Sequence, residues 1–457
     1  MMMTRHFIDV GQGTETRRMH FRKAGSGPAL LMLHQSPRSS KEFETLMRQW
    51  GEHFTCIAMD IPGFGQSEAV PDGDIGAFAD ATIGFLDALG IEKCAAYGFH
   101  SGGMILVTAL KRHPERFSTL AIGGYAVWTE EEKDLFGEQY LPPFHPQPYG
   151  EHLQWLWNRI LEQSWFFPWF AADKDHRLSV AHDDPEVVDV IAREMLEAGD
   201  SYRAGYGAVL NAPRDLPASD AEVPPCLISA YDGDPLQTHF DRLGTLPKGW
   251  ATQKVKTPAE HQSVSLEHLL KSETPTIEAI TEADEEGVCP IEAAGFDGLI
   301  HWKGNRQSGL LRLHAPGFDL NSVDHGQSLA IDLPGHGLSD DWQGEAPTDW
   351  ADWLSVLNAV ADALGTSDIT YAVPPAGDVD QLYPDLSPDR FGCHLNKAWQ
   401  IVRARHMFRP WYEANVAHAI DFDAADIAPD KLAKDHLALL NARAAKAYHT
   451  ALLGRQI

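Results

Sequence analysis

Basic residues are scarce in this chain relative to acidic ones. Its 457 residues include 37 Lys and Arg but 65 Asp and Glu, which gives a formal net charge of −28 at neutral pH. Such a surplus of negative charge repels phosphate backbones and anionic lipid headgroups, so we expect neither nucleic acid nor a membrane as a partner. The partner that these numbers leave open is a small-molecule substrate.

Cysteine is also scarce, and no segment that directs proteins out of the cytoplasm is predicted from the sequence. Its five cysteines lie far apart and their number is odd, which is typical of a reduced, cytoplasmic protein and offers no metal site. The first ten residues do not combine a basic stretch with a long apolar one, so no signal peptide is predicted. The glycine-rich stretches GQGTET and GFGQS lack the lysine of a phosphate-binding loop, and no cofactor is expected.

The first 275 or so residues alternate strand-like and helix-like segments, which predicts an α/β sheet. A helical insert rich in aromatic residues follows the strand at 117–126. An insert at this point lies over the carboxyl ends of the strands, where ligands bind, so Trp128 and Trp165 are candidates for contacting a substrate. The predicted strands are 17–23, 29–35, 54–60, 93–100, 117–126, 224–233 and 251–259.

The stretch YGFHSGG at 97–103 looks like a nucleophile elbow, the sharp strand-to-helix turn that presents a catalytic serine. The usual pattern is Gly-x-Ser-x-Gly. Here Gly98 and Gly102 flank His100, and the serine, Ser101, comes one place late. The elbow pattern is therefore present with a histidine at its tip.

Five motifs, in this order and spacing, resemble the α/β-hydrolase superfamily with a helical cap. The resemblance implies a mostly parallel sheet with helices on both faces, formed by residues 1–128 and 215–275, and a cap over residues 129–214. It also implies a cofactor-independent enzyme that hydrolyses an ester or C–C bond of a small or medium apolar carbonyl substrate. The motifs are LMLHQSP at 31–37, DIPGFGQS at 60–67, YGFHSGG at 97–103, YDGDPL at 231–236 and PAEHQS at 258–263.

The resemblance also implies roles for individual residues. His261, just after the last strand, matches the general base, and Asp234 matches the acid that orients it, with Asp232 as a rival. The oxyanion donors would be the backbone N–H groups of Ser36 and Ser101.

Two residues that precede Ser36 are further candidates for the substrate-binding loop. His34 ends the strand at 29–35, and Gln35 stands where the family usually has glycine. The substitution of glutamine for glycine places a long amide side chain near the pocket.

Three interpretations of the elbow compete. In the first, His100 does chemistry, either by attack on an acyl group or by sharing a proton with His261 as an acid–base pair, which would suit a lyase. In the second, the turn is shifted and Ser101 is the nucleophile, although Phe99 is then bulky where a small residue is needed. In the third, the site is inactive and the protein is a ligand-binding or scaffold protein.

From about residue 290 the landmarks of the first half return. LLRLHAPG at 310–317 echoes LLMLHQSP at 30–37, and the turn after Asp332 echoes the turn after Asp60. In the cap, paired residues keep a constant separation of 242, which is the signature of an internal repeat. The pairs are His152/His394, Trp157/Trp399, Phe166/Phe408, Pro168/Pro410, Trp169/Trp411 and Tyr206/Tyr448.

The second copy lacks the residues that the chemistry needs. Pro375 stands opposite His100, and a proline cannot form the elbow turn. The strands that carry Asp234 and His261 have no counterpart. We therefore expect residues 276–457 to form an incomplete second α/β-hydrolase-like domain, with its core at about 290–392 and cap-like helices at 393–452. The chain would be an intrachain pseudo-dimer or form a homodimer; the alternative is a domain with an unrelated role.

Overall fold

The computed structural model describes residues 3–455, apart from residues 12, 14–15, 71–72, 179–183, 278–282 and 325. The chain divides into two compact units. The first comprises Met1–His145 and Asn158–Glu282, and the second comprises Pro146–Trp157 and Ala283–Ile457. None of the helices in the described ranges combines the length and the apolar character needed to cross a bilayer.

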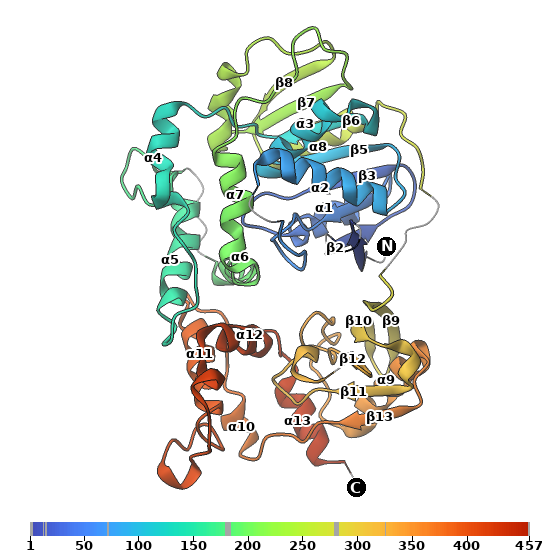
Figure 1. Ribbon diagram of the computed structural model, residues 1–457, viewed down its shortest axis with the longest axis vertical. Helices are drawn as coiled ribbons and strands as arrows, with labels where there is room; N and C mark the ends of the chain where they lie inside the picture. Colours follow the sequence, from blue (N-terminus) through green and yellow to red (C-terminus); the bar gives the residue numbers. More distant parts are fainter. Residues whose placement is uncertain are drawn as a thin grey trace. The chain divides into compact units, whose positions relative to one another are not determined.

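The first unit is built on an eight-stranded sheet with the order β1-β2-β4-β3-β5-β6-β7-β8 (Figure 1). From β4 to β8 neighbouring strands run parallel, whereas β1 and β2 form an antiparallel hairpin at one edge. The strands are β1 (Met3–Val10), β2 (Arg17–Ala24), β3 (Ala29–Leu33), β4 (Thr55–Met59), β5 (Cys94–Phe99), β6 (Phe117–Gly123), β7 (Cys226–Tyr231) and β8 (Trp250–Val255).

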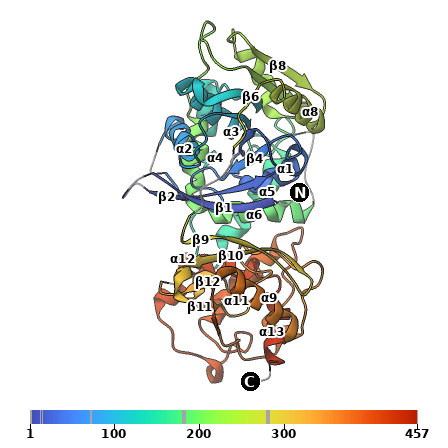
Figure 2. The same cartoon turned by 90° about the vertical axis from the view of Figure 1, so that its right-hand side faces the viewer.

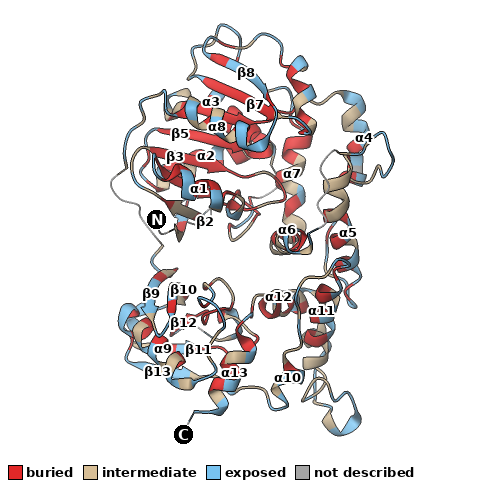
Figure 3. Ribbon diagram, turned by 180° about the vertical axis from the view of Figure 1, so that it is seen from behind, coloured by how far each residue is buried: buried red, intermediate tan, exposed pale blue. Residues whose placement is uncertain are grey.

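The central strands form where the sequence has continuous apolar runs. Every residue of β3 and β4 is buried, as expected of parallel strands covered on both faces, and Figure 3 shows β3, β5 and β7 buried. The seven predicted strands are present. The sequence analysis missed β1, whose buried Phe7, Ile8 and Val10 pair with β2 at the sheet edge.

Helices cover both faces of this sheet (Figure 2). On one face lie α1 (Glu44–Trp50) and α8 (Pro258–Leu269), and on the other lie α2 (Ile75–Ala88) and α3 (Ser101–Arg112). The segment between β6 and β7 forms helices. Its helices are α4 (Glu130–Tyr140), α5 (Glu151–Trp165), α6 (Pro185–Ala198) and α7 (Tyr202–Leu210).

A buried carboxylate ties together the loops that lead to the pocket. Asp60 Oδ2 lies 2.8 Å from His20 Nδ1 on β2, and Asp60 Oδ1 accepts a hydrogen bond of 2.7 Å from the Ser40 N–H. Asp60 Oδ2 also accepts from the Gln66 N–H. Burial by itself would raise the pKa of Asp60, but the neighbouring His20 and Arg22 hold it well below its usual range.

The second unit has a smaller, five-stranded sheet with the order β13-β11-β12-β10-β9. Its strands are β9 (Glu286–Ala293), β10 (Phe296–Gly304), β11 (Leu310–Leu313), β12 (Leu329–Ile331) and β13 (Asp368–Tyr371). Its helices are α9 (Trp350–Leu364), α10 (Val379–Leu382), α11 (Cys393–Arg405), α12 (Pro429–Leu440) and α13 (Ala445–Leu453).

The second unit repeats the carboxylate arrangement of the first. Asp332 Oδ2 lies 2.8 Å from His301 Nδ1, and Asp332 Oδ1 accepts from the Leu320 N–H at 2.8 Å. The sheet ends at β13, and Pro375 lies in the loop between β13 and α10. The second unit therefore keeps the anchoring carboxylate of the repeat and has a loop in place of the elbow.

Within the second unit, residues 146–157 and helix α11 contact each other reciprocally. Trp157 Nε1 donates to the Arg390 carbonyl at 3.0 Å, and Trp399 Nε1 donates to the Pro148 carbonyl at 3.3 Å. The Trp157 ring packs on His394 with centroids 5.3 Å apart, and the Trp399 ring packs on His152 with centroids 4.8 Å apart. Each contact has its mate 242 residues away, which is the self-complementary pattern of a twofold interface.

A glycine at this contact provides a test of the packing. Gly392 has φ of +68°, and a Cβ there would overlap the ring of Trp157. Gly365 has nearly the same backbone, with φ of +72°, and open space around it. Gly365→Ala should cost about 1–2 kcal/mol from backbone strain alone, and Gly392→Ala about 1–3 kcal/mol more because of the overlap. Urea unfolding midpoints measure both; equal losses would contradict the contact.

Candidate active site

The turn between β5 and α3 has its strained residue at position 100. His100 has φ of +45° and ψ of −109°, a conformation that side-chain-bearing residues rarely adopt. Three glycines permit the close crossing of strand and helix. A Cβ on Gly98 would lie 2.6 Å from the Gly103 nitrogen, and one on Gly102 would overlap the Leu33 carbonyl. The backbone thus has the elbow centred on His100, and Ser101 is the first residue of α3.

The side chain of His100 is paired with Asp234. His100 Nε2 lies 3.2 Å from Asp234 Oδ2, and the imidazole is 21% exposed whereas the carboxylate is buried. Asp234 also accepts a hydrogen bond of 2.8 Å from the Leu236 N–H, because it caps the short helix Pro235–Arg242. Burial would raise the pKa of Asp234, but the charge and hydrogen bond of His100 lower it below its usual value. The pair is a partly exposed imidazole oriented by a buried carboxylate.

His261 lies near this pair but bonds elsewhere. It is 2% exposed, and its ring nitrogens lie 2.9 Å from the Tyr97 hydroxyl and 2.8 Å from Ser229 Oγ. In the described part of the chain, no hydrogen bond joins it to Asp234 or His100. The Phe99 ring contacts both imidazoles, with centroids 4.2 Å from His100 and 5.7 Å from His261. The expected His261–Asp234 pairing is therefore replaced by a His100–Asp234 pairing.

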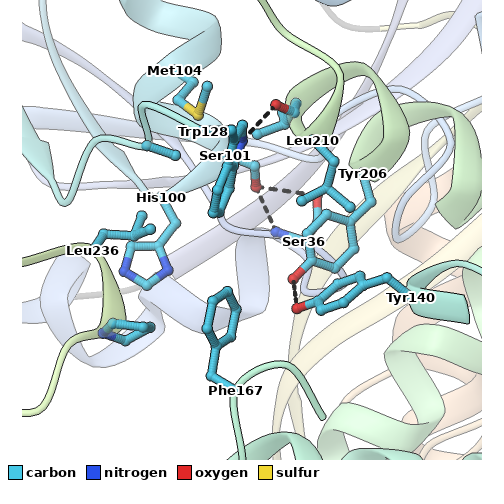
Figure 4. Close-up of a pocket in the computed structure, with 13 residues that line it drawn as sticks. Ser36, His100, Ser101, Met104, Trp128, Tyr140, Phe167, Tyr206, Leu210 and Leu236 are labelled. Atoms are coloured by element: carbon cyan, nitrogen blue, oxygen red, sulfur yellow. Dashed lines mark hydrogen bonds between the residues drawn. The ribbon is translucent and has the colours of Figure 1, made fainter. Parts of the chain in front are cut away.

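Ser101 and Ser36 are hydrogen-bonded to each other (Figure 4). The Ser36 N–H donates to Ser101 Oγ at 2.7 Å, and the Ser101 hydroxyl donates to Ser36 Oγ at 3.1 Å. The Ser36 N–H, an expected oxyanion donor, thus already has an acceptor. The Ser101 N–H is at the first position of α3, where a helix leaves its N–H groups without intrahelical acceptors.

Three other candidates from the sequence lie away from the pocket. His34 is buried and accepts a hydrogen bond of 2.9 Å from the Ile61 N–H. Gln35 turns toward Glu42, to which its side-chain amide donates. Trp165 ends α5 and is absent from the pocket lining. The sequence could not show these orientations, because motif spacing locates a residue but not the direction of its side chain.

The pocket beside His100 is lined by residues of both the core and the cap. Its empty volume is about 430 Å³, solvent at its mouth included. Among the candidates from the sequence, Ser36, His100, Ser101 and Trp128 line it. The sequence analysis did not assign Tyr140, Phe167 and Tyr206 to the site, although all three lie in or beside the aromatic insert. The remaining lining residues are Met104, Ala126, Val209, Leu210, Pro235 and Leu236.

No group of three His, Cys, Asp or Glu side chains within the described ranges is arranged to hold a metal ion. Two of the histidines closest to the pocket, His239 and His261, have pKa values lowered to about 4 by burial. Both are therefore neutral imidazoles at neutral pH.

Comparison with known families agrees with this geometry. Residues 28–201 match the family model of the alpha/beta hydrolase fold. The first unit therefore has the α/β-hydrolase fold. The matched residues run from the start of β3 through the elbow and into the cap, and they include His100.

Individual proteins match the chain over shorter stretches. A 2-hydroxy-6-oxo-6-phenylhexa-2,4-dienoate hydrolase of Burkholderia cepacia is 28% identical over 165 residues, which cover 34% of this chain and 58% of that protein. A 2-(acetamidomethylene)succinate hydrolase of Mesorhizobium japonicum is 30% identical over 132 residues, covering 28% and 46%. The chain thus spans about half the length of these curated relatives. An epoxide hydrolase solved without ligand is 16% identical, with a TM-score of 0.45, over 59% of this chain and 99% of that one.

The buried position of His261 predicts a pH dependence of stability. Burial lowers its pKa from 6.5 to about 4 in the folded chain, so between these values the unfolded chain binds the additional proton. The contribution of His261 to the free energy of unfolding is fully present above pH 6.5 and is lost as the pH falls toward 4. Between pH 7 and 5 the free energy of unfolding of wild type should fall by up to about 2 kcal/mol more than that of His261→Gln.

The control for this measurement is His113→Gln, because the His113 side chain is 39% exposed. Urea unfolding of the three proteins at both pH values gives the comparison. If wild type and His261→Gln lose stability equally between pH 7 and 5, His261 is not buried as a neutral imidazole.

Proposed function

We propose that the first unit is a cofactor-independent hydrolase that cleaves an ester or C–C bond of a small or medium carbonyl substrate, with His100 as a general base. The observation that carries the proposal is the His100–Asp234 pair at the elbow, beside a cap-lined pocket. Both relatives described above are hydrolases by name. The chain's free cysteines support a cytoplasmic location for the enzyme.

In this proposal Asp234 fixes the orientation and protonation of the imidazole. With the Nε2 proton held by the Asp234 carboxylate, Nδ1 of His100 keeps its lone pair and is the basic nitrogen. It removes a proton from a water molecule as the water oxygen bonds to the substrate carbonyl carbon. When the tetrahedral intermediate breaks down, the imidazolium returns that proton to the leaving group.

The developing oxyanion needs donors near the elbow. The Ser101 N–H at the start of α3 and the Ser36 hydroxyl, both at the pocket wall, would supply them. Ser101 itself is a poor candidate for the nucleophile. Its hydroxyl is bonded to Ser36, and no imidazole within the described residues bonds to it.

A proton-transfer lyase is the second candidate, because an imidazole–carboxylate pair without a serine serves a proton abstraction equally well. The pair that this function would use is His100 with Asp234, since His261 bonds to Tyr97 and Ser229 instead. A ligand-binding or scaffold protein is the third candidate. Only turnover of a substrate would distinguish such a binding protein from the hydrolase and the lyase.

We further propose that the chain is an intrachain pseudo-dimer, in which the second unit is a degenerate copy of the first. The support is the reciprocal contact within the second unit, in which Trp157 donates to the Arg390 carbonyl and Trp399 donates to the equivalent Pro148 carbonyl. A homodimer of full chains remains an additional proposal, which sedimentation of the purified protein would test.

Substitutions at the two neighbouring aspartates test the assignment of the base. Asp234→Asn and His100→Ala should each lower kcat/KM by about 10²-fold or more against a panel of activated esters and C–C bond substrates, because positioned general bases contribute on that scale. Asp232→Asn is the matched control. Asp232 is exposed and bonds to Gln237, so its replacement should leave kcat/KM within about twofold.

Ser101→Ala separates the general-base mechanism from a serine nucleophile. Loss of one hydroxyl beside the oxyanion should cost about tenfold, far less than loss of His100. Activity that survives His100→Ala and disappears in Ser101→Ala would refute the proposal and establish a shifted serine elbow.

A further inference from the structure

The cap contains a buried arginine with two nitrogens that lack hydrogen-bond partners among the described residues. Arg159, on α5, is 1% exposed. Its Nη1 donates to Gln163 Oε1 at 2.6 Å, but its Nε and Nη2 have no hydrogen-bond partner among the described residues. A buried guanidinium is normally bonded to a carboxylate or to several carbonyls, because desolvation of a cation is costly.

The surroundings of Arg159 are aromatic. Its guanidinium lies 5.4 Å from the ring centre of Trp169 and 5.8 Å from that of Tyr202. Such contacts stabilise a cation through the ring faces. They supply no acceptor for the two unpartnered nitrogens, so no carboxylate of the described residues is hydrogen-bonded to this guanidinium.

The internal repeat shows that the cap does not need an arginine at this position. The residue 242 positions later is Ile401, on α11, which is 3% exposed. The neighbouring pair Trp157 and Trp399 fixes this alignment. An aliphatic side chain therefore fills the equivalent place in the copy without an elbow, and the arginine occurs in the copy that has one.

Arg159 is connected to the pocket wall through the two rings that it contacts, Tyr202 and Trp169. Tyr202 and Tyr206 are four residues apart on α7, so they share a face of that helix about one turn, or about 5.4 Å, apart. Tyr206 lines the pocket, and its hydroxyl lies 3.0 Å from that of Tyr140, which also lines it (Figure 4). Trp169, over which Arg159 stacks, donates to the Tyr140 carbonyl at 3.2 Å.

The hydroxyl groups of Tyr140 and Tyr206 together have one O–H that can donate to a ligand. One phenol donates to the other, and the second O–H remains for a ligand in the pocket. Burial raises the pKa of Tyr206, which keeps its hydroxyl protonated as a donor, while the Arg159 charge acts in the opposite direction. A donor backed by a buried cation favours an acceptor that carries negative charge.

We propose that the cap end of the pocket, formed by Tyr140 and Tyr206 with Arg159 behind them, binds a carboxylate of the substrate. The proposal rests on the function proposed above and specifies it: the substrate is apolar in its middle, has its reactive carbonyl at His100 and carries an anionic end under the cap.

Binding of unreactive ligands tests this subsite without reference to turnover. The probes are 4-phenylbutanoate and its neutral isostere 4-phenylbutanamide, and calorimetry or ligand-observed NMR gives their affinities. Wild type should bind the carboxylate about tenfold more tightly than the amide, as expected for a charge-assisted hydrogen bond. Arg159→Ile, which installs the residue of the second copy, should abolish this preference while the affinity for the amide stays within about twofold.

Arg203→Ile is the matched control. It removes the same charge from the same cap, but the Arg203 side chain is 42% exposed, so the carboxylate preference should persist. His100→Ala should also keep the preference, because the subsite does not include the elbow. If turnover fails and the preference remains, the proposed reaction is wrong and the subsite stands.

Two results would overturn the subsite. One is equal affinity of wild type for the carboxylate and the amide, a comparison that needs no variant to fold. The other is a carboxylate preference that persists undiminished in Arg159→Ile.

Discussion

The close crossing of α3 over β5 is the constraint on which the site depends. Gly98, Gly102 and Gly103 leave no room for side chains between strand and helix, and the residue at the crossing, His100, takes up a positive φ. This backbone aims residue 100 at the pocket whatever its side chain is. With an imidazole there, the side chain reaches the Asp234 carboxylate directly. A hydroxyl group at the same position would be too short to do so and would need a separate base between itself and the acid.

The length of the elbow side chain also explains the position of His261. His100 reaches Asp234 itself, and His261 bonds to Tyr97 and Ser229 instead. Burial lowers the pKa of His261 and so keeps its imidazole neutral. The site thus has one accessible imidazole, oriented by a buried carboxylate, and a second imidazole enclosed behind it. General-base catalysis through the first follows from this arrangement more directly than a proton exchange between the two.

Sequence reasoning could reach the fold and the centre of the site but not the pairing of its side chains. The apolar run ALLML and the glycines around His100 constrain the backbone, so β3 and the turn follow from local composition. Which imidazole meets Asp234 depends on the directions of the His100 and His261 side chains, which the spacing of motifs does not predict. The same limit applies to Gln35, which turns to Glu42, and to Tyr140 and Tyr206, which lie far apart in sequence and meet only through the folding of the cap.

The second unit shows which features the fold retains when the elbow is lost. His301 and Asp332 keep the buried pairing of His20 and Asp60, because it ties a strand to two loops in either copy. Pro375 and Ile401, by contrast, stand where the first copy has His100 and Arg159. The second copy therefore lacks both the elbow residue that lines the pocket and the buried arginine of the cap.

The measurement that tests the general-base account most directly is rapid-quench mass spectrometry of wild-type enzyme during a single turnover of an activated ester in ¹⁸O-labelled water. The account predicts that the enzyme keeps its unmodified mass throughout and that the acid product carries the label. An acyl group on Ser101 that forms and decays at the rate of turnover would contradict it, and so would an acyl group on His100.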